Sequence, residues 1–238
     1  MCLNSLAMGV WGWWAFDIFT LIASYMNTAA IAAQTILRTL GLITFMLPVG
    51  IMSASGTLIG NSVGAGRGDH AVLYYNTSMK MGVVLAFVQV LVLLIGEDLF
   101  VLLFTNQEAV GEQMRLAWPL LMVFVVFDTT QGISSSVIRG TGQQRIGSYI
   151  TSSAYWAFGI PISLLCVFVW EDGIRGLWFG PTFAVLYNTI CYTFLIQRIN
   201  WPDLVQKVKE RRAKDKADNA SKVAEQKTEA PKETESSN

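Results

Sequence analysis

Three ionisable side chains, Asp17, Arg38 and Asp128, interrupt long apolar stretches of the sequence. A charge at the centre of a membrane helix costs about 2.5 kcal/mol or more, so such residues usually mark an ion or substrate pathway. Asp17 lies about ten residues before the polar pair Asn27–Thr28, and Arg38 lies about ten residues after it. If two antiparallel helices meet at this pair, the regular rise of a helix places both charges near the same depth.

Two interpretations of Asp17 follow from this placement. In the first, Asp17 is a carboxylate in a water-filled cavity, where it exchanges a proton for a cation. In the second, Asp17 and Arg38 form an ion pair that satisfies two buried charges. Asp128 lies about eleven residues before Arg139, which also places it near the middle of a span, with no basic residue expected at its depth. We therefore predict that Asp17 and Asp128 are the substrate or proton-coupling residues, with Arg38 as a candidate charge partner.

The composition indicates an all-α, polytopic membrane protein. Of the 238 residues, 53% are hydrophobic and only 14% are charged, whereas about a quarter of a soluble domain is charged. Nine of the 17 basic and eight of the 17 acidic residues lie in the last stretch, 201–238, so the first 200 residues are poorer still in charge. The sequence contains no basic patch for a nucleic acid, and we expect none as a partner.

The apolar runs predict a six-helix membrane lobe over residues 1–200, followed by a charged tail over 201–238. A span needs about 20 mostly apolar residues. Pro48 and Gly50 predict a kink or break in the second span. The start of the tail, WPDLVQKVKERRAK, either forms an amphipathic helix on the membrane, with Leu204, Val205 and Val208 facing lipid, or is solvated, and the rest is expected to be disordered. The six spans are predicted at about residues 3–26, 29–59, 79–104, 108–137, 146–170 and 177–199.

Charges in the loops predict the orientation. One face of the predicted lobe collects most of the basic loop residues, and the other collects most of the acidic ones. The positive-inside rule assigns the basic face, and with it both termini, to the cytoplasm. The basic residues are Arg67, Lys80, Arg139, Arg145 and Arg198; the acidic residues are Glu97, Asp98, Glu108, Glu112, Glu171 and Asp172.

The sequence gives no sign of an enzyme. The three cysteines lack metal-ligand spacing, and no Ser–His–Asp or Cys–His arrangement is available for catalysis. The segment GAGRG (64–68) follows no predicted strand, so it is not expected to bind a nucleotide. We predict no cofactor beyond a coupling ion, which is H⁺ or Na⁺.

Several motifs together resemble the multidrug and toxic compound extrusion (MATE) family, in its eukaryotic-like branch. GWWAFD (12–17) is similar to the seventh-helix signature of that family, with Asp17 at its second acidic position and Gly12 in place of the first acid. AAQTILRTL and MLPVGIMSASGTLIGNSVGAG resemble the eighth helix and the loop after it. FDTTQGISSSVIRGTGQQRIG resembles the tenth helix, with Asp128 at the acidic position of the family, and INW closes the match.

This resemblance implies a transporter of twelve helices in two lobes, of which this chain matches only the C-terminal lobe. The chain would then be a truncated gene product, an incomplete chain or a half-sized protein. The implied function is secondary antiport of a small organic solute, with a cationic solute favoured, in the plasma or vacuolar membrane. Asp17 would face the cavity between the lobes, and the partners would be membrane lipid and either the missing N-terminal lobe or a second copy. Further cavity or motif residues are Trp13, Trp14, Gln34, Gln131 and Arg139.

Two other functions compete with antiport. A non-transporting remnant lobe would bind or regulate a full-length relative. A flippase for lipid-linked substrates would share the architecture but would need several cationic residues in its cavity, where the sequence offers Arg38 alone. The absent acid at Gly12 and the cation at Arg38 depart from the family pattern, and a cation beside Asp17 would weaken its attraction for a cationic solute.

Overall fold

The computed structural model describes residues 2–210 and residue 213, and it describes residues 2–8 by their backbone alone. Within these residues the chain is almost entirely helical. A further short helix covers residues 201–210. The main helices are α1 (Cys2–Ser24), α2 (Thr28–Met46), α3 (Val49–Gly64), α4 (Gly68–Ile95), α5 (Glu97–Phe104), α6 (Glu108–Gly140), α7 (Gln144–Ser152), the π-helix η1 (Ser153–Gly159), α8 (Ile160–Phe168) and α9 (Gly173–Gln197).

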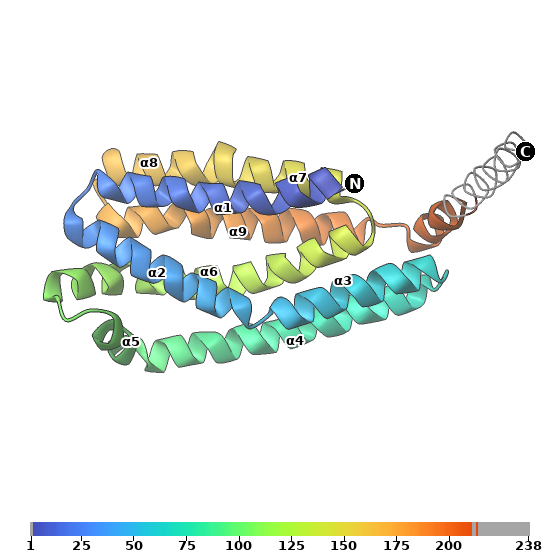
Figure 1. Ribbon diagram of the computed structural model, residues 1–238, viewed down its shortest axis with the longest axis horizontal. Helices are drawn as coiled ribbons and strands as arrows, with labels where there is room; N and C mark the ends of the chain where they lie inside the picture. The colour runs from blue at the N-terminus through green and yellow to red at the C-terminus, as the bar shows by residue number, and fades with distance from the viewer. Residues whose placement is uncertain (1, 211–212, 214–238) are drawn as a thin grey trace, which may run out of the picture.

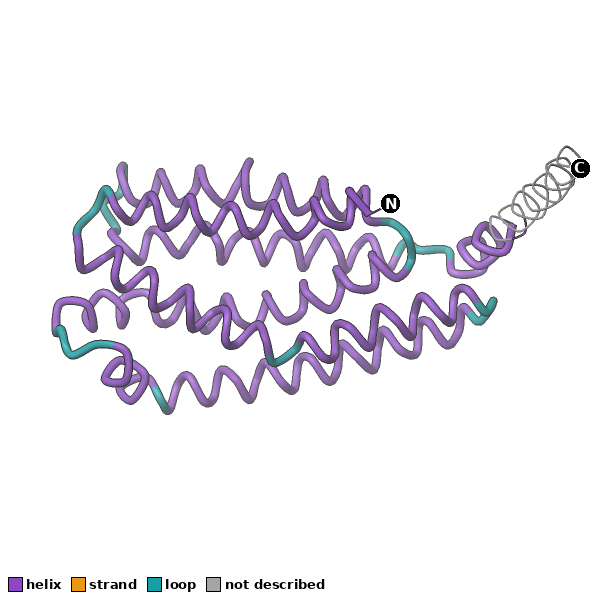
Figure 2. Tube along the Cα trace, in the orientation of Figure 1, coloured by secondary structure: helices purple, strands orange, loops and turns teal. Residues whose placement is uncertain are grey.

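The helices form an elongated bundle, with their axes roughly along its length (Figure 1). Helix α6 is its centre, because it packs against α2, α3, α4 and α9. Helices α7, η1 and α8 form one continuous rod that lies against α1 and α9. Short loops connect the helices, most of them at the two ends of the bundle and one, between α2 and α3, near its middle (Figure 2). The all-helical membrane lobe expected from the sequence is therefore the architecture observed.

Five helical segments are long and apolar enough to cross a membrane, judged by length and composition over the described residues. The first expected span, residues 3–26, corresponds to α1, which has 23 residues but is not among the five. Its 23 residues are long enough to cross a bilayer. The five segments are Thr28–Met46, Gly68–Ile95, Glu108–Gly140, Gln144–Phe168 and Gly173–Gln197.

Two of the expected spans are each divided into two helices in the structure, the first of them at the break predicted near Pro48. The run 29–59 forms two helices, α2 and α3, that separate at Leu47–Pro48, where proline lacks the N–H needed to continue the hydrogen-bond ladder. The run predicted at 79–104 forms α4, which already begins at Gly68, and the short α5, with a break at Gly96. A Cβ at position 96 would approach the Val92 carbonyl oxygen to 2.8 Å, so the tight turn requires glycine.

The loops place opposite charges at opposite ends of the bundle. The α3–α4 turn, the α6–α7 turn and the end of α9 lie at the end that also holds the N-terminus (Figure 1). These segments carry Arg67, Arg145 and Arg198. The far end holds the α4–α5–α6 and α8–α9 connections, with the acidic pairs Glu97–Asp98 and Glu171–Asp172. The separation expected from the sequence is thus present for these loop residues, whereas Lys80, which was expected at the basic end, lies well within α4.

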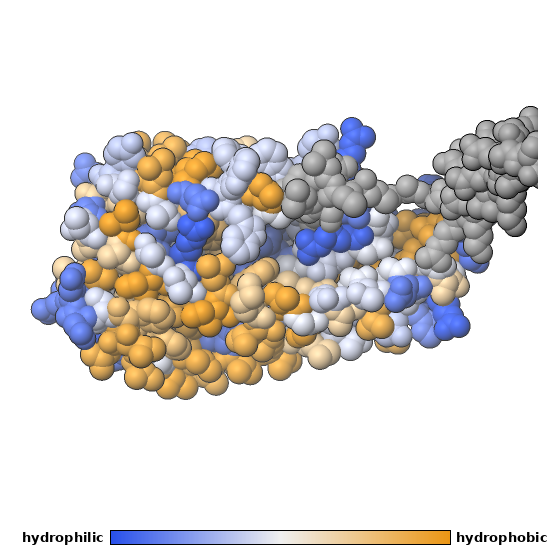
Figure 3. Space-filling model, viewed as in Figure 1, coloured by the Kyte–Doolittle hydropathy of each residue, from blue (hydrophilic) through white to orange (hydrophobic). Residues whose placement is uncertain are grey.

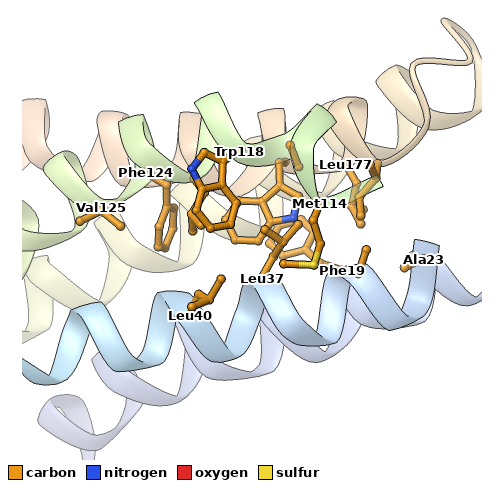
Figure 4. Close-up of a cluster of buried hydrophobic side chains, with 14 of the residues drawn as sticks. Phe19, Ala23, Leu37, Leu40, Met114, Trp118, Phe124, Val125 and Leu177 are labelled. Atoms are coloured by element: carbon orange, nitrogen blue, oxygen red, sulfur yellow. The ribbon is translucent and has the colours of Figure 1, made fainter. Parts of the chain in front are cut away.

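The main core joins α1, α2, α6 and α9 around large side chains (Figure 4). Phe19, Leu37, Met114 and Trp118 are fully buried there. The Trp118 Nε1 donates a hydrogen bond to the Leu93 carbonyl oxygen at 3.1 Å, which ties α6 to α4. This core fixes the angular position of α6, and with it the face that α6 presents to the other helices.

A second cluster joins the helix at 201–210 to the ends of α3, α4 and α9. Val205 is only 8% exposed, and Leu204 and Val208 pack at the edge of the same cluster. The expectation that Val205 faces lipid is therefore wrong, because this cluster buries it, whereas Leu204 and Val208 are only half-buried. Gly66 has a φ of +83°, and a Cβ there would lie 2.6 Å from Lys209 Cε. Gly66 thus adopts the left-handed backbone of the turn between α3 and α4, next to the helix at 201–210.

The outer face of α4 and α5 is apolar. Figure 3 shows orange side chains along the edge that these helices form in Figure 1. Large exposed side chains on this face include Val84, Phe87, Ile95 and Leu103. A continuous apolar surface of this kind is favoured in contact with lipid and disfavoured in water.

Candidate functional site

A cavity of about 210 Å³ lies between α1, α2, α6, η1 and α9. Its walls combine aromatic side chains, among them Phe124, Tyr155 and Trp178, with polar side chains from α6. A mostly apolar hollow with a few convergent polar groups is the usual form of a small-molecule site. The polar groups on its walls therefore decide what it can bind.

Asp128 is the carboxylate of this cavity, and it is 8% exposed. Gln131 Nε2 donates a hydrogen bond to Asp128 Oδ1 at 2.9 Å. The Gln131 Oε1 accepts in turn from Asn188 Nδ2 at 3.0 Å, and Asn188 is fully buried in α9. No cation pairs with Asp128 among the described residues. One amide donor therefore supports a buried carboxylate that can still take up a proton or a cation.

Asp128 begins a polar stripe along one face of α6. Gln131, Ser135 and Arg139 follow it at steps of three or four residues, which is the spacing that repeats on one helix face. All four side chains line the cavity. Arg139 lies at the end of the stripe, where its Nη2 donates to Ser135 Oγ at 3.1 Å and to Ser136 Oγ at 3.3 Å.

Asp17 and Arg38 form an ion pair, with 2.8 Å between Arg38 Nη2 and Asp17 Oδ1. The equal depth predicted for these two residues is confirmed. Arg38 lines the cavity, whereas the Asp17 side chain is 64% exposed and is not part of the cavity wall. The two charges pair as in the second interpretation, but the Asp17 carboxylate is exposed rather than buried. Asp17 reaches the cavity wall only through its contact with Arg38.

The other predicted cavity residues divide into two groups. Trp13, like Gln131 and Arg139, lines the cavity. Trp14 does not line it and packs edge to face with Trp11, with 6.3 Å between ring centroids. Gln34 is also absent from the wall; it is buried, and its Oε1 accepts a hydrogen bond from Trp178 Nε1 at 2.9 Å. Gln34 therefore positions a wall residue.

Two further residues of the site, Tyr155 and Asn188, were not predicted from the sequence. Tyr155 lies in the π-helix η1 and is buried against the cavity. A Cβ at Gly12 would lie 3.5 Å from Tyr155 Cε2, so a longer side chain at position 12 would compete with this ring for space. Asn188 could have been found as an amide within the apolar run of α9, since a polar group in that setting needs a partner.

Comparisons with known proteins find relatives along most of the chain. A profile for the family described as MatE matches residues 6–165. The chain is 30% identical over 211 residues to Multidrug and toxin extrusion protein 2 of Mus musculus, and the aligned region covers 89% of this chain and 37% of that protein. It is 26% identical over 206 residues to Multidrug and toxin extrusion protein 1 of Homo sapiens, covering 87% of this chain and 36% of that protein.

A solved structure shares the fold. The crystal structure of the eukaryotic MATE transporter AtDTX14 aligns with a TM-score of 0.84 at 26% identity and covers 88% of this chain. The aligned region is 47% of that transporter. The chain therefore spans less than half of the length of the relatives that it matches.

Proposed function

Because this chain belongs to the MatE family, we propose that it acts as one lobe of a secondary antiporter, which exports small organic solutes in exchange for H⁺ or Na⁺. The observation that carries the proposal is Asp128, a buried carboxylate in the cavity without a cation partner among the described residues. The names of the relatives support extrusion of drugs and toxins as the class of transport.

The mechanism follows from competition for one negative charge. A proton or metal cation on Asp128 neutralises the carboxylate and disfavours a cationic solute, whereas the bound solute disfavours the ion. Because the ion and the solute exclude each other from Asp128, the flow of one across the membrane is coupled to the flow of the other, provided that the site opens to one side of the membrane at a time. A second lobe opposite the cavity would provide the other wall, and it would be either an N-terminal six-helix lobe or a second copy of this chain.

Transport assays in proteoliposomes test this function. Vesicles that contain the chain together with the N-terminal half of a MatE relative are loaded with tetraethylammonium, and a proton or sodium gradient is imposed. We expect gradient-dependent export from these vesicles and none from vesicles that contain the N-terminal half alone. A third preparation with this chain alone distinguishes a homodimer from a two-lobe pair. If the paired lobes fold but export nothing under either gradient, the chain is a non-transporting lobe.

We further propose that the basic end of the bundle faces the cytoplasm, in the plasma or vacuolar membrane. The separation of charges between the two ends supports this orientation. In oriented vesicles, an impermeant thiol reagent should label Arg145→Cys only from the cytoplasmic side and Asn106→Cys only from the opposite side. The unchanged chain gives the background from its own cysteines, and the reverse pattern would contradict the orientation.

A further inference from the structure

Gln89 is a buried amide in α4, and the helix around it is apolar. It lies in the run MGVVLAFVQVLVLLI (81–95), where it is the only side chain with a strong hydrogen-bonding group, and it is 4% exposed. A buried amide inside an apolar membrane helix costs free energy unless it has partners on neighbouring helices. The site proposed around Asp128 does not include Gln89, so its partners indicate a separate role.

The main partner of Gln89 is a backbone carbonyl at the break between α2 and α3. Gln89 Nε2 donates a hydrogen bond to the Thr44 carbonyl oxygen at 2.6 Å. In an α-helix that oxygen accepts from the N–H of the residue four positions later, which here is Pro48 and has no N–H. A carbonyl freed by proline within a membrane needs another donor from the protein, because lipid offers none. Gln89 therefore supplies the donor that the proline lacks.

The other end of the Gln89 amide faces α6. Its Oε1 lies 3.5 Å from the hydroxyl oxygen of Thr129, which follows Asp128 in the chain. One turn further along α4, the Leu93 carbonyl oxygen accepts from Trp118 Nε1 at 3.1 Å, so α4 is itself held on α6. Gln89 thus links the end of α2, by way of α4, to the helix that carries the carboxylate of the site.

This link affects the wall of the main cavity. Helix α2 contributes Arg38, Leu42 and Phe45 to that wall, and α6 contributes Asp128. Because the hydrogen-bond ladder is interrupted at a proline, contacts from outside the helix set the direction of the chain there. Phe45 follows Thr44 directly, so the bond to the Thr44 carbonyl oxygen fixes the last part of α2 that lines the cavity.

From these contacts, and resting on the function proposed above, we propose that Gln89 is a positioning residue for transport. It holds the end of α2 at the break and so fixes the distance between the α2 and α6 walls of the cavity. Gln89 does not line the cavity, so it acts through α2 and not on the solute. Its loss leaves the Thr44 carbonyl oxygen without a donor and allows the α2 wall to shift.

A cycle of two substitutions tests the hydrogen bond. Gln89→Leu removes the amide at nearly the same size and should lower the midpoint of thermal unfolding of the full chain by about 2 to 4 °C, as expected for one buried hydrogen bond. Pro48→Ala restores a backbone N–H for the Thr44 carbonyl oxygen, so Gln89→Leu should no longer lower the midpoint in that background. Thr35→Val removes an exposed hydroxyl that donates within α2, and this control should leave the midpoint unchanged.

Export of tetraethylammonium tests the positioning role. In proteoliposomes that also contain the N-terminal half of a MatE relative, Gln89→Leu should raise KM by about fivefold, the factor that corresponds to one hydrogen bond. It should change kcat less, because the Asp128 carboxylate is untouched. Thr35→Val should leave both constants unchanged. A purely structural role of Gln89 would reduce the amount of folded protein and leave the KM of that protein as it is.

The outcomes separate this proposal from the proposed function. An equal fall of the midpoint in both backgrounds would show that Gln89 only packs, and an unchanged KM would show that its bond does not position the wall; either result overturns the proposal. Should Gln89→Leu not fold, the yield of folded protein replaces the midpoint, and the proposal requires Pro48→Ala to restore that yield. If the unchanged chain exports nothing, the proposed function fails and the positioning role with it, whereas the midpoints still decide whether Gln89 serves the Thr44 carbonyl oxygen.

Discussion

Asp128→Asn is expected to abolish gradient-driven export, with a loss of at least about tenfold in rate. Asparagine has nearly the same shape and retains an oxygen that can accept from Gln131 Nε2, as Asp128 Oδ1 does at 2.9 Å. The amide cannot ionise at any pH at which the protein is folded, so neither a proton nor a cation can be exchanged at this position. The helix and its packing should therefore persist while the coupling is lost.

The measurement is solute export from proteoliposomes at several values of the imposed gradient. Asp172→Asn is a suitable control, because it removes an exposed carboxylate at the end of the bundle, outside the cavity. It should leave export unchanged. Gradient-dependent export that survives in a folded Asp128→Asn variant would show that coupling resides in another group.

Arg38→Ala is expected to reduce the yield of folded protein severalfold, and adding Asp17→Asn should restore much of the loss. The single change leaves the Asp17 carboxylate without the guanidinium that lies 2.8 Å from it. An unpaired carboxylate near the middle of a bilayer is costly, whereas a neutral amide at the same position is much less so. The double variant removes both charges and with them most of this cost.

The yield of folded protein is measured by size-exclusion chromatography for the unchanged chain, Arg38→Ala, Asp17→Asn and the double variant, each extracted from an equal amount of membrane. The four yields give the coupling between the two sites. Arg175→Ala removes an exposed arginine outside the cavity and serves as the control, with an expected yield close to that of the unchanged chain. If the effects of Arg38→Ala and Asp17→Asn simply add, the two side chains have separate surroundings in the membrane.

The similar level of Asp17 and Arg38 could be predicted because it depends on local and regular features, whereas the sequence left open whether the two side chains pair. Asn27 caps α2 by accepting a hydrogen bond from the Ala30 N–H at 2.7 Å, and it fixes the turn between the two helices. From that turn, the constant rise of the helix gives the depth of both charges. The placement of Asp128 and Arg139 on one face of α6 depends on the same regularity.

Other features could not be predicted, since they depend on contacts between distant segments. Gln34 and Gln131 are both amides within apolar runs, and their sequence surroundings do not show which of them faces the cavity. One meets Trp178 and the other meets Asp128, and only the packing of α9 and α6 decides which of them faces the cavity. The break at Gly96 was missed for a related reason, because an apolar run continues across it and composition alone does not mark the end of a helix.

The π-helix η1 changes the direction in which the side chains after it point from the rod of α7, η1 and α8. A π segment holds more residues per turn than an α-helix, so the residues of α8 are rotated relative to the pattern that α7 begins. A helical wheel drawn over 144–168 with a single period would therefore assign the wrong face to every residue after Gly159. Deleting one residue between Ser153 and Gly159 would restore the α period and turn Tyr155 away from the cavity or shift the register of α8. The length of this segment is thus as constrained as its residue types, and an insertion or deletion there would alter the cavity wall more than most substitutions.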